Sequence, residues 1–103
     1  MSYKYGNHFP PIHQYYVAGS ATALSTTATE VTEGGVYLLN SGNVVIYVRI
    51  TDASDNTTPT ADNGFTLAVN SNMTVYIKTG QYIHASDPGQ NNSSGCYTLL
   101  KPY

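Results

Sequence analysis

Hydrophobic and polar residues alternate along most of this chain with a period of two, which places successive side chains on opposite faces of a β-strand. In the segment 44–50, one face carries only valine and isoleucine, whereas the other carries Val45, Tyr47 and Arg49. Two further segments alternate in the same way, and their core-facing residues are predicted to be Phe65, Leu67, Val69, Met73, Val75 and Ile77. The 3.6-residue period of an amphipathic helix is absent, so the sequence predicts an all-β fold.

Turn-forming residues interrupt the alternation roughly every 8 to 12 residues, a spacing typical of sandwiches and barrels. The strands are predicted at 14–18, 21–24, 29–32, 36–40, 44–51, 65–69, 73–79, 81–85 and 96–101. The turn Asn40-Ser41-Gly42-Asn43 lies between two strongly apolar segments and is the clearest hairpin signal in the chain. The prediction is a single antiparallel β-sandwich, of jelly-roll or immunoglobulin-like topology, with an extended N-terminal arm.

The first residues of the chain lack sustained alternation, and Pro10-Pro11 forbids a helix there and favours an extended path. We therefore expect an extended arm over residues 1–13 and a sandwich domain over residues 14–103. The arm is rich in aromatic side chains, which favours docking on its own sheet or on a neighbouring molecule over a free tail. The residues assigned to partner binding in this part of the chain are Tyr3, Tyr5, His8, Phe9, Pro10, Pro11, Ile12 and Tyr15.

Length and charge exclude several classes of protein. A chain of 103 residues has room for one domain. Four basic residues against six acidic ones leave no basic surface for nucleic acid or for anionic lipid. The longest apolar run, Val44–Val48, is far too short to span a bilayer, and no apolar secretory signal opens the chain. With Cys96 as its single cysteine, the protein is expected in a cytosol or in a particle assembled there.

Catalytic chemistry finds little support in the sequence. Three histidines, His8, His13 and His84, accompany many serines, but no Gly-x-Ser-x-Gly elbow is present. His84 is predicted to be a surface or interface residue. Cys96 has no basic neighbour in the sequence to activate it, so a packed, inert thiol is expected. The protein is therefore expected not to be an enzyme.

A metal site is also not expected, and neither is a cofactor. The acidic and polar segment that starts at Asp52 fails as an EF-hand loop, because Thr57 and Asn63 occupy the places of the required glycine and carboxylate. A looser calcium loop stays open beside the favoured interpretation, a hydrated or interface loop. His8 and His13 lack third and fourth ligands.

Residues 22–101 carry a sequence of motifs that resembles small β-sandwich structural proteins of tailed bacteriophages. The motifs are Ala21-Thr22-Ala23-Leu24, Val36-Tyr37-Leu38-Leu39-Asn40-Ser41-Gly42, Val45-Ile46-Tyr47-Val48, Thr60-Ala61-Asp62-Asn63-Gly64-Phe65-Thr66-Leu67, Met73-Thr74-Val75-Tyr76-Ile77, Tyr82-Ile83-His84-Ala85 and Tyr97-Thr98-Leu99-Leu100. The chain departs from that pattern at Glu33-Gly34-Gly35, where an arginine-rich segment is common, and at Asn70-Ser71-Asn72, which lacks the usual glycine. The resemblance implies a virion protein, most often a head decoration or cement protein.

On this basis we expect a capsid decoration protein that binds the outer head surface and bridges neighbouring subunits. Its expected partners are the major capsid protein or another virion protein and further copies of itself, with trimers among the arrangements that capsid symmetry offers. The outward tyrosines expected to make contacts are Tyr47, Tyr76 and Tyr82. The rival hypothesis is a host-receptor or glycan-binding module on a tail or fibre.

Overall fold

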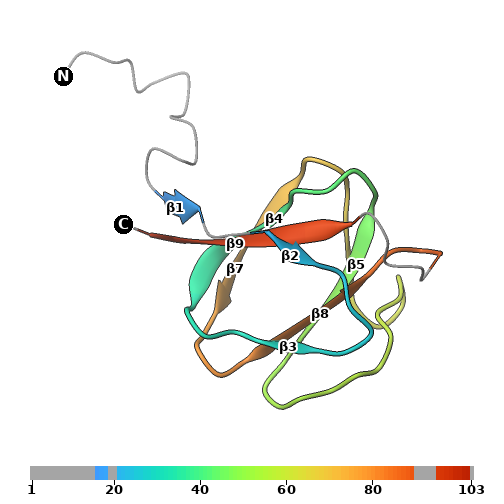
Figure 1. Ribbon diagram of the computed structural model, residues 1–103, viewed down its shortest axis with the longest axis horizontal. Helices are drawn as coiled ribbons and strands as arrows, with labels where there is room; N and C mark the ends of the chain where they lie inside the picture. Colours follow the sequence, from blue (N-terminus) through green and yellow to red (C-terminus); the bar gives the residue numbers. More distant parts are fainter. Residues whose placement is uncertain (1–15, 19–20, 90–94, 103) are drawn as a thin grey trace.

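The computed structural model describes residues 16–18, 21–89 and 95–102, and Figure 1 shows their arrangement. These residues form nine strands and no helix. The strands are β1 (Tyr16–Ala18), β2 (Thr22–Ala23), β3 (Thr29–Glu30), β4 (Gly35–Asn40), β5 (Ile46–Thr51), β6 (Phe65–Leu67), β7 (Asn72–Ile77), β8 (Tyr82–Ser86) and β9 (Cys96–Pro102). Each one overlaps a predicted strand. The predicted arm, residues 1–13, lies outside the described residues, and so do residues 14 and 15 at the start of the predicted domain.

The strands build two antiparallel sheets, which confirms the predicted all-β sandwich. Sheet A has the order β1-β9-β4-β7, and β2 also pairs with β9. Sheet B has the order β3-β8-β5-β6. Figure 1 shows β9 of sheet A and β8 of sheet B as separate layers of the body.

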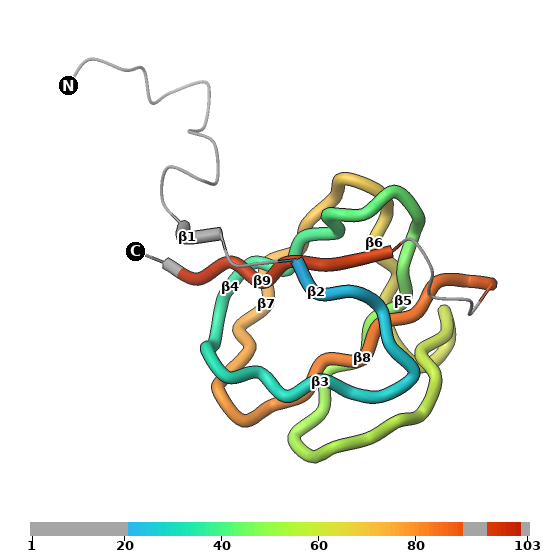
Figure 2. The backbone as a smooth tube through the Cα atoms, viewed as in Figure 1, coloured from blue at the N-terminus to red at the C-terminus, as the bar shows by residue number. Residues whose placement is uncertain are grey.

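The pairing of the strands is nested along the chain. The pair β5–β6 is innermost, followed outward by β4–β7, β3–β8 and β2–β9. Successive pairs belong alternately to sheet B and sheet A. The chain is therefore one long hairpin wound into two sheets, as the path in Figure 2 shows. Of the two predicted topologies, this is the jelly roll.

The core lies between the two sheets and is built from the faces that the alternation predicts. Ile46 and Val48 of β5 are fully buried, and so is Ile77 of β7. On β7, buried or half-buried residues alternate with exposed ones, so Thr74 and Tyr76 face outward. Each fully buried aliphatic side chain contributes about 1.5–3 kcal/mol to folding.

The prediction for Val69 is wrong, because this side chain is 43% exposed rather than in the core. β6 ends at Leu67, and the chain then enters a turn. In that turn the Ser71 amide donates to the Ala68 carbonyl over 3.1 Å, and Asn70 has a φ of 60°. The turn ends the alternation before it reaches Val69.

The predicted hairpin at Asn40-Ser41-Gly42-Asn43 is also wrong. β4 and β5 lie in different sheets, because β7 and β9 already pair with the two sides of β4. The turn is a corner between the sheets, and the fully buried Asn40 holds it. The Asn40 side-chain amide donates to the carbonyls of Val44 (2.8 Å) and Leu67 (2.9 Å), and its Oδ1 accepts from the Gly42 amide (3.1 Å).

Candidate binding surface

The outer face of sheet B is covered by the chain itself. The long loop between β5 and β6, residues 52–64, folds back over this face and buries Pro59 completely. The Ser86 hydroxyl of β8 donates to the Pro59 carbonyl over 3.0 Å, although Ser86 points away from the core. Where this loop covers it, the outer face of sheet B is therefore not free to contact a partner.

An ion pair helps to hold this loop on the sheet. Arg49 Nη1 of β5 lies 3.3 Å from Asp55 Oδ2. Asp55 also accepts a hydrogen bond from the Thr57 amide over 2.9 Å. The hydrogen bonds from Thr57, together with the nearby Arg49 guanidinium, lower the pKa of Asp55 to about 2.

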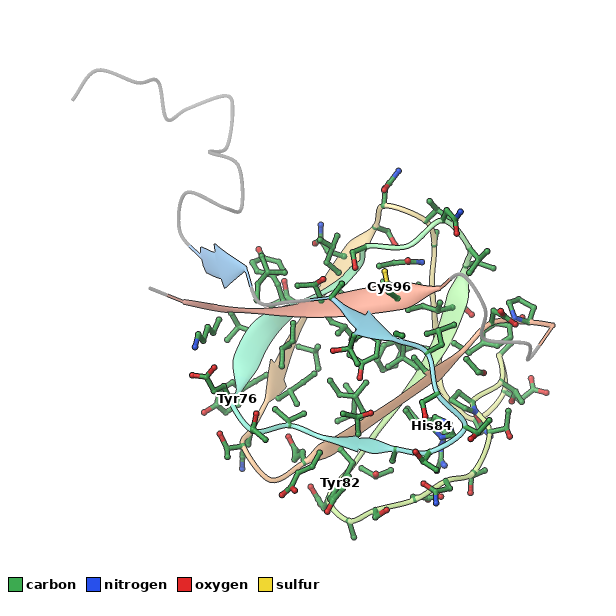
Figure 3. All side chains as sticks on the ribbon, viewed as in Figure 1. Tyr76, Tyr82, His84 and Cys96 are labelled. Carbon is green, nitrogen blue, oxygen red and sulfur yellow. The ribbon has the colours of Figure 1, made fainter. Side chains whose placement is uncertain are left out.

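His84 is buried, so the prediction of a surface or interface histidine is wrong. Its side chain is 3% exposed, and its Nε2 lies 3.0 Å from the Ser25 carbonyl oxygen. A carbonyl only accepts, so Nε2 carries the proton. The alternation correctly places His84 on the face opposite Ile83, away from the core. Its side chain is buried by a segment of the chain that does not belong to sheet B. Figure 3 shows His84 beside the segment that joins β2 to β3.

Three side-chain oxygens of the candidate calcium loop accept hydrogen bonds from the protein itself. Asp52 Oδ1 accepts from the Gln81 side-chain amide over 2.9 Å, and Asn56 Oδ1 accepts from the Ala28 backbone amide over 2.8 Å. Asn63 Oδ1 accepts from the Thr60 amide over 2.8 Å within the loop. Across residues 21–89 and 95–101, no three His, Cys, Asp or Glu side chains cluster closely enough to hold a metal ion. The loop's polar side chains instead fix its own path.

Cys96 is half-buried at the start of β9. Its Sγ lies 3.4 Å from the Ser41 hydroxyl, which is 2.9 Å from the Thr98 hydroxyl. The thiol thus belongs to a small polar cluster at the corner between β4 and β5, as its position in Figure 3 shows.

The structure separates the three tyrosines predicted for partner binding. Tyr47 lies on β5 and Tyr82 on β8 of sheet B, and both are half-buried. Tyr76 lies on β7 of sheet A, apart from Tyr82 in Figure 3. Tyr76 is 70% exposed. The arm residues Tyr3, Tyr5, His8, Phe9, Pro10, Pro11 and Ile12, and also Tyr15, lie outside the described residues.

Tyr76 stands beside a shallow pocket of about 500 Å³ at one end of sheet A. The pocket is lined by Gly34, Gly35, Val36, Tyr76, Ile77, Lys78 and Thr79. Gly34 has no room for a side chain, because a Cβ there would lie 2.6 Å from the Ile77 carbonyl oxygen. Close by in the sequence, Glu33 forms an ion pair of 2.6 Å with Lys101 of β9.

β7 is the longest edge strand among the described residues. It lies at the edge of sheet A and has six residues, whereas the other described edge strands, β1, β2, β3 and β6, have three or fewer. It has no charged residue between Asn72 and Ile77. We call the β7 strand, with its exposed Asn72, Thr74 and Tyr76, the β7 edge. The alternation predicted Thr74 and Tyr76 to face outward, but it placed Asn72 in a turn and gave no sign that the strand lies at an edge.

Among the described residues, no helix is long and apolar enough to cross a membrane. The chain matches no protein-family model, no curated protein and no solved structure.

Proposed function

We propose that this protein is a capsid decoration or cement protein of a tailed bacteriophage, which binds the outer head surface and bridges neighbouring subunits. The observation that carries the proposal is the difference between the two sheets. Sheet B is covered by its own loop, whereas sheet A ends in the uncharged β7 edge with the 70% exposed Tyr76. One side of the molecule is thus closed, and the other is suited to contact.

The composition of the chain supports a role in dense protein packing. Only 10% of its residues are charged, and serine, threonine and asparagine supply most of the polar surface. Burying ionised groups at an interface is costly, whereas these neutral groups lose less on leaving water. A tyrosine such as Tyr76 adds a large contact area with few rotatable bonds and keeps a hydroxyl for a partner. Repetition on a capsid lattice then multiplies weak contacts.

The topology is compatible with this function. Jelly rolls serve as viral capsid and lectin domains, among others. A fold alone does not define a function, so the proposal depends on the β7 edge and on the resemblance of residues 22–101 to phage structural proteins.

We further propose that the protein acts without catalysis and without a cofactor. Its buried polar side chains away from the core, His84 and Ser86, lie beneath covering segments of the chain. The contacts described for them hold those segments in place, which is a structural task.

Binding to assembled heads tests the proposal. The full chain is incubated with heads of the encoding phage that lack it and, separately, with unassembled capsid protein, and bound protein is measured by co-sedimentation. Saturable binding to heads, with a higher temperature of head disruption, is expected. Tyr76→Ser should weaken binding, whereas Thr66→Ala, on an exposed residue of β6, should leave it unchanged. Absence of binding to heads would contradict the proposal.

The pocket beside Tyr76 favours a second candidate, a glycan-binding module of a tail or fibre, because an exposed tyrosine ring can stack on a sugar. Titration with glycans, followed by NMR, separates the two functions. Saturable shifts at Tyr76 and Lys78 would support the glycan-binding module, and their absence together with head binding would support the decoration protein.

A further inference from the structure

The β7 edge has backbone groups that no described strand uses. The backbone amide of Asn40 donates to the Ser71 carbonyl over 2.9 Å, which makes these two residues a hydrogen-bonded pair at the start of the β4–β7 ladder. In an antiparallel ladder such pairs alternate with pairs whose backbone groups point away from each other. The register Leu39↔Asn72 and Tyr37↔Thr74 therefore turns the backbone N–H and C=O groups of Asn72 and Thr74 outward.

Free edges of this kind are usually protected. Proteins cover them, shorten them, place charges on them or interrupt them with bulges, because an open edge accepts a strand from another chain. Here the first charged residue, Lys78, comes after the strand. The register shift between Gly35 and Tyr37 affects the pairing near Ile77 and leaves Asn72–Thr74 in regular register. The β7 edge is thus open at its first half.

The chain contains a segment that could occupy this edge. Fifteen residues precede β1, and in extended form they reach up to about 50 Å. Their first part alternates aromatic and polar residues at Tyr3, Lys4 and Tyr5. Pro10-Pro11 lacks backbone N–H groups, so a paired strand would be confined to the residues before it.

The position of β1 indicates which copy accepts this segment. β1 and β7 lie at opposite edges of sheet A. Strands β9 and β4 separate β1 from the β7 edge of the same molecule. A neighbouring molecule can instead present its β7 edge directly beside β1, in the plane of the sheet.

We propose that residues 2–9 of one copy add as an extra strand to the β7 edge of a neighbouring copy. Each copy then donates at one edge of sheet A and accepts at the other. Such a head-to-tail contact generates a closed ring where the rotation between copies closes, and an open chain where it does not. This association needs no capsid, so it stands or falls separately from head binding.

Paramagnetic labelling of the full chain tests the proposal. A nitroxide is attached to Ser2→Cys in a Cys96→Ser background, and this protein is mixed with ¹⁵N-labelled chain that carries no nitroxide. Loss of intensity at the amides of residues 72–77 of the ¹⁵N-labelled chain is expected. If those amides lose intensity only when both labels are in one molecule, the segment binds its own edge and the proposal is wrong. It is also wrong if the amides stay unaffected or the loss falls elsewhere.

A pair of variants at Thr74 provides the control in the ¹⁵N-labelled chain. Thr74→Pro removes the outward N–H of the edge but leaves the ladder with β4 intact, so it should abolish the intermolecular loss of intensity and reduce the mass in light scattering. Thr74→Ala keeps the N–H and should change neither. If both variants fold and show the same loss of intensity and the same mass, strand addition is contradicted. If Thr74→Pro does not fold, the labelling experiment on the unaltered edge decides the matter.

Discussion

The imidazole of His84 donates to the carbonyl of Ser25 over 3.0 Å, although the two residues are 59 positions apart in the chain. His84 lies on the outer side of β8, and Ser25 belongs to the segment between β2 and β3. The bond thus fastens a connecting segment of the chain to sheet B. The Nδ1 atom of His84 is buried without a hydrogen-bond partner among the described residues, so the single hydrogen bond through Nε2 orients the ring.

Replacing His84 by alanine should lower the free energy of unfolding by about 2–3 kcal/mol, through the lost hydrogen bond and the space left by the ring. Urea unfolding followed by circular dichroism measures this change. Thr66→Ala, on an exposed residue of the same sheet, serves as the control. A His84→Ala protein as stable as the control would show that the segment does not depend on this bond.

Asn40→Ala should cost about 2–4 kcal/mol, because the carbonyls of Val44 and Leu67 lose their donor inside the protein. The same substitution at Asn72, an exposed residue of β7, is the matched control and should change stability little. Both are compared by urea unfolding. Equal effects of the two substitutions would refute the role of Asn40 as the corner between the sheets.

The hydrogen bonds from Thr57 to Asp55, together with the Arg49–Asp55 ion pair, should make stability depend on pH in the acid range. The pKa of Asp55 is lowered from 3.8 to about 2 in the folded protein, so its contribution is present above 3.8 and is lost as the pH falls toward 2. The difference in unfolding free energy between the native protein and Asp55→Asn should therefore shrink over this window. Asp62→Asn controls for the loss of one negative charge. A difference that stays constant from pH 6 to pH 2 would contradict the assignment.

Tyr97 should make the protein sensitive to alkali. Burial raises the pKa of its phenol above the ordinary value of 10, and hydrogen bonds with Thr29 and Thr22 partly oppose the shift. The unfolded chain then loses this proton first, so stability falls as the pH rises above 10. Urea unfolding between pH 8 and pH 11 should show a weaker decline for Tyr97→Phe than for Tyr76→Phe, whose ring is exposed. Equal declines would rule out Tyr97 as the cause.

The sequence predicted the strands and most of their faces because the period of two is a local property. It placed Ile46, Val48 and Ile77 in the core, where they are fully buried. It did not predict which strands pair, and so the turn after Asn40 was interpreted as a hairpin rather than a corner. His84 was misplaced for a related reason, since the segments that bury it come from distant parts of the chain.

The candidate binding surface was predictable only in part. Outward tyrosines follow from the alternation, but sheet order decides that Tyr76 lies on an open edge, and the fold leaves Tyr47 and Tyr82 half-buried on sheet B. Asn40 could have been noticed as a polar residue that ends an apolar strand, although its three hydrogen bonds are visible only in the folded chain.

Hydrogen–deuterium exchange of the full chain, free and bound to assembled heads, tests most directly whether the β7 edge is the binding surface. The free chain is measured at a dilution where it is monomeric, so that no neighbouring copy occupies the edge. Slower exchange on binding is then expected at Asn72 and Thr74, whose amides point away from β4, while the loop 52–64 exchanges at the same rate in both states. Protection confined to that loop, or none in β7 with heads saturated, would contradict the proposed binding surface.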